Sequence, residues 1–332
     1  MNGSLTAAII GSGYIGKRHI AAYKSLGLKI VVCSNDIETG QKLAEEYNAK
    51  FYEDYHEMLQ KETLDLVSVC LPTYLHYDAT MAALDNHVNV LCEKPLAINV
   101  AEGRKMVEAA RESGCLLMEA MISTLNPNFL AVASRIDEIA PVRNYSSHFC
   151  QYSSKFEALK RGEVATSFKP GTAGALRDVG VYTIYPLVAL FGRPQSVEGK
   201  LHTVETSEGT SDVCGTACLH YEGMDATLTW SKTYDSFQPT EIAGENGNLI
   251  LDEIHIARKA EIVPHAAPTS GQGPKPGRTL LSEGLPMNEY YYEFKEFADL
   301  LEQGKKESAN NSLQTSLAVL EIIETLIASS FY

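Results

Sequence analysis

Residues 11–16 read Gly11-Ser12-Gly13-Tyr14-Ile15-Gly16. This run follows the apolar stretch 5–10 and leads into an amphipathic stretch, 14–26, so the order is strand, glycine turn and helix. In such a unit the first glycine forms a turn with positive φ, the second lets backbone N–H groups approach a pyrophosphate, and the third lets the helix pack closely on the strand. The N–H groups that begin the helix have no partners within it and can bind the anion. We therefore predict that residues 11–16 bind a dinucleotide cofactor.

The alternation of strands and helices continues to about residue 122. We predict further strands over 29–33, 64–70, 88–92 and 116–118, and helices over 39–47, 76–86 and 101–113. Nearly continuous runs of valine and leucine are typical of parallel strands that are covered on both faces. We therefore predict a doubly wound α/β domain of the Rossmann type over residues 1–122.

Beyond residue 122 helices give way to alternating strands. We predict a hairpin of strands 212–221 and 225–233, two short strands within 239–251, a surface loop or lid over 264–277, and amphipathic helices over 289–303 and 313–329. These elements predict a second domain of the α+β class over residues 123–332, with a large, mostly antiparallel open sheet.

The 332 residues carry a net charge of -14 and include seven cysteines. This acidic excess is unfavourable for binding nucleic acid or an anionic membrane, because both require a basic face. An odd number of cysteines in a long chain is not typical of a disulfide framework, so we expect reduced thiols in a cytoplasmic protein. Cys214, Cys218 and His220 share one face of a predicted strand, but zinc requires a fourth ligand, and we expect no metal.

Two polar segments follow consecutive strands of the predicted parallel sheet. The first contains Leu71, Pro72, Thr73 and His76, and the second contains Glu93 and Lys94 before Pro95. Ligands of open α/β sheets lie at the carboxyl ends of the strands, so we expect these residues to line the cofactor. Pro95 restricts the backbone and can be cis, which would direct the Lys94 ammonium toward a nicotinamide or a substrate hydroxyl. The alternative is a solvated lysine in an ordinary turn.

Asp178 and Tyr182 lie four residues apart in a predicted helix that runs to Phe191, so they share one face of it. A carboxylate, a phenol and a lysine together form a set suited to proton transfer. The reference pKa of tyrosine is about 10, and a neighbouring ammonium in a dry pocket would favour the phenolate. The alternative is a helix cap and a core tyrosine.

These motifs, in this order, resemble the Gfo/Idh/MocA oxidoreductase family, which includes glucose–fructose oxidoreductase and dimeric dihydrodiol dehydrogenase. The matching segments are the glycine turn, Glu93-Lys94-Pro95, Glu119-Ala120, Asn126-Pro127, and Gly174-Ala175-Leu176 with Asp178, Gly180 and Tyr182. The resemblance implies a Rossmann domain and a second domain whose sheet binds substrate and forms the interface of a homo-oligomer. It implies that the final helices can pack back toward the first domain. It also implies that Lys94, Asp178 and Tyr182 are catalytic, in a branch with tyrosine in place of histidine.

The sequence departs from the family pattern at three places. Only the last of three frequent glycines is kept in Thr172-Ala173-Gly174, and Thr124 replaces an arginine that is common before the Asn-Pro pair. After the second strand, Ser34 and Asn35 stand where an NAD site usually has an acid for the ribose hydroxyls, and Asp36 is the nearby candidate for that acid. Ser34 cannot repel a 2′-phosphate, which favours NADP over NAD, although no arginine adjoins it.

We therefore predict an NAD(P)-dependent dehydrogenase or reductase that acts on a secondary alcohol or carbonyl of a sugar, a polyol or a cyclic diol. In this hypothesis Tyr182 exchanges the hydroxyl proton, Lys94 polarises the oxygen, and Asp178 orients the pair. Two alternatives stay open: a non-catalytic cofactor-binding sensor, and an imine- or biliverdin-type reductase on the same two-domain frame. The retention of all three side chains favours an enzyme.

Overall fold

The computed structural model describes residues 5–265 and 277–330. Two compact units make up the chain. Unit 1 comprises Met1–Met121 and Tyr290–Leu320, and unit 2 comprises Ile122–Glu289 and Glu321–Tyr332. Most of the predicted loop over 264–277 lies outside the described residues.

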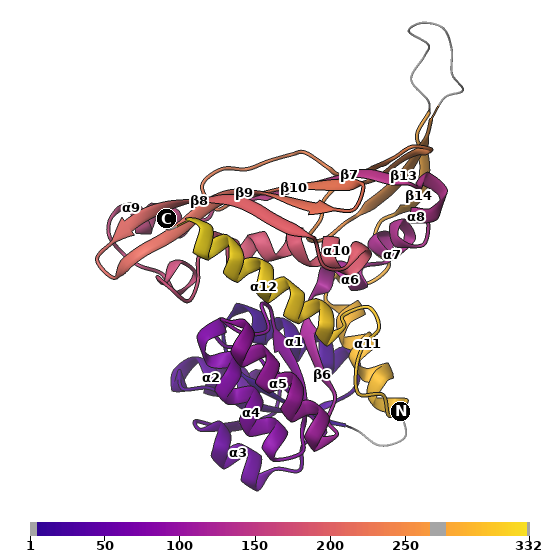
Figure 1. Cartoon of the computed structure of the whole chain (residues 1–332). Coiled ribbons are helices and arrows are strands. Elements are labelled where there is room, and N and C mark those ends of the chain that lie inside the picture. Colours follow the sequence, from indigo (N-terminus) through magenta and orange to yellow (C-terminus); the bar gives the residue numbers. More distant parts are fainter. Residues whose placement is uncertain (1–4, 266–276, 331–332) are drawn as a thin grey trace, which may run out of the picture. The chain divides into compact units, whose positions relative to one another are not determined.

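Unit 1 is built on a six-stranded parallel sheet in the order β3-β2-β1-β4-β5-β6. Figure 1 shows this part of the chain in indigo and purple, with β6 and several of its helices labelled. The strands are β1 (Thr6–Ile10), β2 (Lys29–Cys33), β3 (Lys50–Tyr52), β4 (Leu66–Val69), β5 (Asn89–Glu93) and β6 (Leu117–Ala120). This order is that of the Rossmann fold, with β1 paired in parallel with β2 and β4. The predicted doubly wound α/β sheet is confirmed. Its strands carry continuous apolar runs because helices cover both faces.

Helices accompany each strand of this sheet. They are α1 (Tyr14–Ser25), α2 (Ile37–Glu46), α3 (Tyr55–Lys61), η1 (Thr73–Leu75), α4 (His76–Asp85), α5 (Val100–Ser113), α11 (Tyr291–Glu302) and the first part of α12 (Leu313–Ser330). The ends of α5 follow local signals: the side chain of Asn99 accepts the N–H of Glu102 at 2.8 Å, and Gly114 ends the helix with φ 65°. The sequence analysis omitted β3 and α3, because β3 is a short, half-exposed edge strand without an apolar run.

Unit 2 is built on an eight-stranded sheet in the order β14-β13-β12-β11-β7-β10-β9-β8. The strands are β7 (Val142–Cys150), β8 (Ser196–Thr206), β9 (Gly209–Tyr221), β10 (Met224–Ser231), β11 (Thr240–Gly244), β12 (Gly247–Leu251), β13 (Lys259–Pro264) and β14 (Thr279–Glu283). Neighbouring strands of this sheet are antiparallel except β7 and β10, which run parallel. The mostly antiparallel sheet is confirmed, as is its β9-β10 hairpin, in which Tyr221 pairs with Met224.

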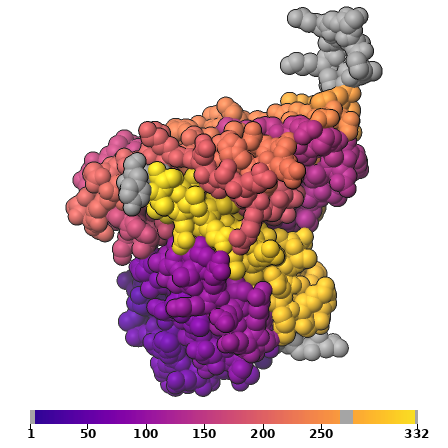
Figure 2. Space-filling model, viewed as in Figure 1, coloured from indigo at the N-terminus to yellow at the C-terminus, as the bar shows by residue number. Residues whose placement is uncertain are grey.

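One face of this sheet carries the core of unit 2, including Tyr145, Leu228 and Trp230, each at most 1 % exposed. The short helical segments of this unit are α6 (Ile122–Leu125), α7 (Pro127–Ala133), α8 (Ile136–Ile139), α9 (Phe156–Lys160), η2 (Thr166–Phe168), η3 (Leu176–Gly180) and α10 (Val181–Phe191). The sequence analysis did not predict the short helices directly after residue 122, among them α7, which Asn126 caps and in which Pro127 occupies the first turn. The second part of α12 covers β8, where a Cβ added at Gly199 would lie 2.4 Å from Leu326 (Figure 2).

The seven cysteines all carry free thiols. None of the helices within 5–265 and 277–330 combines the length and the apolar character that a bilayer span requires.

Candidate active site

The glycine turn has the geometry that its sequence predicts. Gly11 has φ 114°, and a Cβ added there would lie 2.4 Å from the carbonyl oxygen of Cys70, so the position accepts only glycine. A Cβ at Gly16 would lie 2.0 Å from the carbonyl oxygen of Gly11. Gly13, by contrast, is exposed and would meet nothing within 4 Å. It is the N-cap of α1, which has no side-chain cap and no acidic residue in its first turn, so this helix end fits a pyrophosphate.

The end of β2 carries the predicted ribose-binding residues. The hydroxyl of Ser34 is buried and lies 2.8 Å from that of Ser12. It also accepts the N–H of Asp36 at 3.1 Å, while Asn35 is exposed. The carboxylate of Asp36 accepts the N–H of Thr39 at 3.1 Å and so caps α2. Hydrogen bonds with the side chain and with the backbone of Thr39 lower the pKa of Asp36. One oxygen of Asp36 is therefore engaged as the N-cap of α2.

The turn after β5 presents Lys94, which is half-buried. The peptide bond between Lys94 and Pro95 is cis, as the sequence analysis anticipated. The Glu93 carboxylate lies 3.0 Å from Nε2 of His19 and accepts the N–H of Lys94 at 3.2 Å. His19, fully buried in α1, therefore anchors the residue that precedes the lysine.

Two further buried side chains hold the other half of this turn. His76 places Nδ1 3.0 Å from the carbonyl oxygen of Pro95 and Nε2 2.8 Å from that of Leu71. Burial lowers the pKa of His76, and its ring contacts protein on both sides. Glu119 of β6 accepts the N–H of Leu96 at 3.1 Å. The predicted segments Leu71–Thr73 and Glu93–Lys94 thus meet at one edge of the sheet, as their strand ends require.

Sequence reasoning missed His19 as a contact of the turn and treated Glu119 only as part of a family motif. A signal existed for His19, which lies on the buried stripe of α1 with Ile20 and Tyr23. A histidine in an apolar stripe requires a polar partner.

Glu119 gives a pH prediction. Burial raises the pKa of this carboxyl from 4.5 to about 7. The native state therefore holds the proton more tightly, so the stability contribution is complete below pH 4.5 and is lost as the pH rises through 7. A shift of this size corresponds to about 3 kcal/mol of unfolding free energy, which is lost above pH 7. Glu119→Gln keeps an acceptor for Leu96 and should raise the melting temperature at pH 8.5 but hardly at pH 5.

The control for this measurement is Glu112→Gln, at an exposed position on α5. The melting temperatures of both variants and of the wild type are measured by thermal unfolding at the two pH values. An equal effect of Glu119→Gln at both pH values would contradict the assignment of the proton to this carboxyl.

In unit 2 the predicted pair Asp178 and Tyr182 lies at the junction of η3 and α10. The segment Leu176–Gly180 is a π-helical turn, so the expectation of one regular helix through Asp178 is corrected there. Asp212 of β9 starts this turn, because its carboxylate accepts the N–H of Leu176 at 2.7 Å. Burial raises the pKa of Asp212 to about 6.

The backbone conformation and surroundings of Gly174 explain why the sequence keeps this one of the three family glycines. It has φ 128°, and an added Cβ would lie 1.8 Å from Oδ1 of Asp212. A side chain at this position would displace the carboxylate that begins η3. Asp212 was not singled out from the sequence, because it lies 36 residues from the turn that it caps.

Tyr182 lies in an aromatic cluster. Its ring meets that of Phe149 edge to face at 5.4 Å and that of His255 at 6.0 Å, and Phe149 stacks on His255 at 4.2 Å. Asp178 is 39 % exposed, and its Oδ2 lies 2.6 Å from Nζ of Lys232. Lys232 was not anticipated; the only signal was a lysine directly after a strand in which apolar and polar residues alternate.

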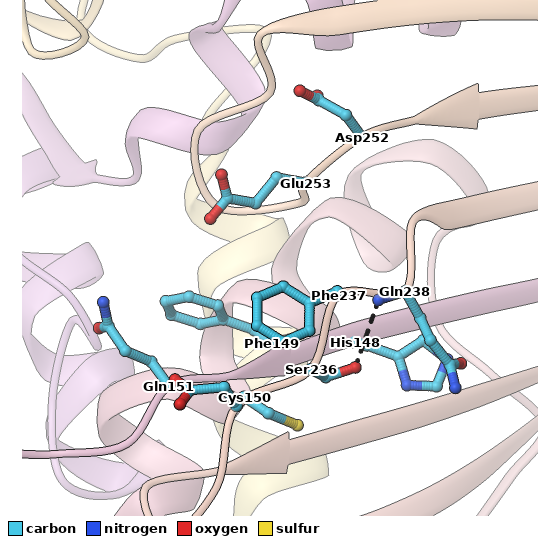
Figure 3. Close-up of a pocket in the computed structure, with 10 residues that line it drawn as sticks. His148, Phe149, Cys150, Gln151, Ser236, Phe237, Gln238, Asp252 and Glu253 are labelled. Atoms are coloured by element: carbon cyan, nitrogen blue, oxygen red, sulfur yellow. Dashed lines mark hydrogen bonds between the residues drawn. The ribbon is translucent and has the colours of Figure 1, made fainter.

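A pocket of about 320 Å³ opens beside Phe149 (Figure 3). Its lining residues are His148, Phe149, Cys150, Gln151, Asp235, Ser236, Phe237, Gln238, Asp252 and Glu253. The lining contains three carboxylates and no lysine or arginine. One of the carboxylates, Glu253, lies 2.9 Å from Nδ1 of His255, and the hydrogen bond with this ring lowers the pKa of Glu253. The wall of the pocket is therefore continuous with the aromatic cluster around Tyr182.

Within residues 5–265 and 277–330 no group of three or more histidine, cysteine, aspartate or glutamate side chains is placed to hold a metal ion. Lys94 belongs to unit 1, and Asp178 and Tyr182 belong to unit 2.

Two family models match the chain. The model described as "Oxidoreductase family, NAD-binding Rossmann fold" matches residues 5–121, and the model "GFO/IDH/MocA C-terminal domain" matches residues 129–250. The chain is 34% identical over 324 residues to scyllo-inositol 2-dehydrogenase (NADP(+)) IolU of Bacillus subtilis, covering 96% of this chain and 94% of the relative. It is 27% identical to D-xylose 1-dehydrogenase (NADP(+)) of Hypocrea jecorina, covering 86% of this chain and 77% of that protein.

The fold is also that of a solved levoglucosan dehydrogenase in complex with NADH and levoglucosan. The TM-score is 0.85 at 18% identity, over 99% of this chain and 98% of that one. Together with the glycine turn, the Glu93-Lys94-Pro95 turn and the η3 segment, these matches show that the chain belongs to the Gfo/Idh/MocA oxidoreductase family.

Proposed function

We propose that this chain is an NADP-dependent dehydrogenase that oxidises a secondary hydroxyl of an uncharged polyol or sugar, or catalyses the reverse reduction. The observation that carries the proposal is the start of the helix in unit 2, where a lysine-paired carboxylate, Asp178, precedes Tyr182 by one turn beside a polar pocket. The similarity to an inositol dehydrogenase over nearly the whole chain supports the same reaction class.

Each side chain has a distinct role in this proposal. Tyr182 accepts the proton of the substrate hydroxyl during oxidation and returns it during reduction. Lys94 contributes positive charge at the same oxygen and favours the phenolate of Tyr182. Asp178 orients the pair. We propose that the three side chains converge on one substrate, although they come from different units of the chain.

The residues of unit 1 fit a dinucleotide. When bound, the nicotinamide supplies or accepts the hydride. The open position at Gly13 and the uncapped start of α1 would hold the pyrophosphate. Leu71, Pro72, Thr73 and Glu93 belong to the neighbouring strand ends and would border the nucleotide. NADP is favoured because Ser34 carries no charge and Asp36 already caps α2.

The pocket beside Phe149 supports an uncharged substrate. Carboxylates and amides bind sugar hydroxyls as acceptors and donors. Asp235, Asp252 and Glu253 would repel a phosphate group, and no cation in the lining compensates them. Free polyols and sugars therefore fit this pocket better than sugar phosphates or nucleotide-linked sugars.

The test is a substrate panel with purified protein and either NADP⁺ or NAD⁺. It contains scyllo-inositol, D-xylose, levoglucosan, a sugar phosphate and a nucleotide-linked sugar, and the readout is the absorbance of reduced nicotinamide. We expect turnover with an uncharged compound, with a higher kcat/KM for NADP⁺ than for NAD⁺. NADPH binding without turnover of any compound would favour the sensor, and reduction of an imine or of biliverdin alone would favour the other reductase class.

A homo-oligomer is the second part of the proposal. In the described part of unit 2, the sheet face opposite the core presents small side chains on adjacent strands, such as Ser146 and Cys218, which are partly exposed, and Thr227, which is exposed. Phe237 is 95% exposed. We expect a dimer or tetramer in light scattering and weaker association after Phe237→Asp. A monomer at all concentrations would contradict this part.

A cytoplasmic location is also proposed. All seven cysteines carry free thiols, and thiols persist in reducing compartments. Fractionation of the source cells would test it, and recovery of the protein outside the cytoplasm would contradict it.

A further inference from the structure

Lys232 is a buried lysine that follows β10 directly. Its side chain is only 4 % exposed, although lysine is rarely buried without a compensating partner. Its backbone is fixed on both sides, because its N–H donates to Val213 at 2.9 Å and its carbonyl oxygen accepts the N–H of Ser153 at 3.0 Å. The ammonium therefore starts from a rigid position.

Three groups, two from η2 and one from η3, surround this ammonium. It donates to Oδ2 of Asp178 at 2.6 Å and to the carbonyl oxygen of Ser167 at 2.9 Å. The ring of Phe168, fully buried, lies with its centroid 4.0 Å from Nζ. The cation is buried while Asp178 is 39 % exposed, so the ammonium holds the inner side of a carboxylate whose outer side is accessible.

We infer that Lys232 is a positioning residue for the proposed reaction, holding Asp178 as a fixed carboxylate beside Tyr182. This inference rests on the proposed function. Its chemical consequence is that Asp178 does not carry the proton, because the ammonium stabilises its charged form. The exchangeable proton then belongs to Tyr182, and Asp178 acts through its negative charge and its orientation.

Other charged groups lie near Lys232 and Asp178 and affect how the activity depends on pH. Asp212 interacts electrostatically with both Lys232 and Arg177, and Arg177 also interacts with Glu324 of α12. Removing Lys232 therefore also changes the charge near Asp212, and the double variant shows whether a loss of activity arises at Asp178 or at Asp212.

The experiment compares Lys232→Met, Lys232→Arg, Asp178→Asn and the double variant Lys232→Met/Asp178→Asn in the full chain. The assay is the dehydrogenase reaction of the wild type across pH. Lys232→Met should lower kcat about tenfold or more, because Asp178 is no longer held in one orientation. The acid limb of its plot of kcat against pH should move to higher pH by about one to three units, because Asp178 loses a cation within contact distance. The KM for NADP⁺ should stay near that of the wild type.

Lys232→Arg keeps the charge but not the shape, so it should retain the wild-type acid limb with a reduced kcat. The double variant should be no slower than Asp178→Asn alone, since Lys232 acts through Asp178. Lys200→Met, at an exposed position of β8, is the matched control and should behave as the wild type. Thermal unfolding of each variant shows that it is folded.

An unchanged kcat and pH profile in Lys232→Met would overturn the inference, and so would losses that multiply in the double variant. If Lys232→Met does not fold, a displaced acid limb in Lys232→Arg overturns it in the same way. Failure of the proposed function looks different: the wild type would then turn over no polyol, or Asp178→Asn and Tyr182→Phe would keep full activity.

Discussion

Replacing Tyr182 by phenylalanine is expected to lower turnover by about 10²–10⁴-fold, because the variant lacks the hydroxyl that exchanges a proton with the substrate oxygen. The contacts of Tyr182 with Phe149 and His255 are ring-to-ring contacts that phenylalanine can also make, so the variant should fold normally. Affinity for NADPH should change little, since the residues proposed to bind the nucleotide belong to unit 1. Steady-state kinetics and fluorescence titration with NADPH measure the two quantities separately.

Lys94→Ala should cause a loss of the same order, because it removes the positive charge proposed to lie at the same oxygen. The matched control for Tyr182→Phe is Tyr221→Phe. The hydroxyl of Tyr221 donates to the carbonyl oxygen of Gly192 at 3.0 Å. That variant removes a hydrogen bond at the far end of α10 and should keep normal turnover. Undiminished activity in both Tyr182→Phe and Lys94→Ala would refute the catalytic assignment.

Replacing Gly16 by alanine is expected to destabilise unit 1 and to abolish binding of NADPH. The new Cβ would lie 2.0 Å from the carbonyl oxygen of Gly11 and 3.1 Å from its carbonyl carbon, so backbone must move. Overpacking of this kind costs about 3 kcal/mol, which lowers the melting temperature of a domain of this size by roughly 10 °C. Calorimetry and NADPH titration measure the two effects.

Gly13→Ala is the control that separates packing from binding. Its Cβ would meet nothing within 4 Å, and its φ of -70° suits any residue. We expect a melting temperature close to that of the wild type and a weakened affinity for NADPH, because the methyl group occupies space that the pyrophosphate needs. Wild-type affinity in this variant would show that the phosphates do not bind at the start of α1.

The parts of the site that could be predicted from the sequence are those whose structure is decided within a few residues. Gly11 requires positive φ, Asn99 caps the next turn, and Tyr221 pairs across a two-residue connection with Met224. Each of these depends on sterics or a hydrogen bond within its own segment. The expected regular helix through Asp178 was wrong because the π-helical turn there depends on Asp212, a residue of another strand.

By itself, the sequence determined the Rossmann unit and the mostly antiparallel second sheet, and it indicated Lys94, Asp178 and Tyr182 as candidate residues. Only the tertiary structure revealed what holds those residues: His19 on Glu93 across 74 positions, Glu119 on Leu96 across 23, and Lys232 on Asp178 across 54. The reason is physical. A turn or cap is stabilised by neighbours that local geometry forces together, whereas a buried polar side chain takes whichever partner the packing of distant elements brings within hydrogen-bonding distance.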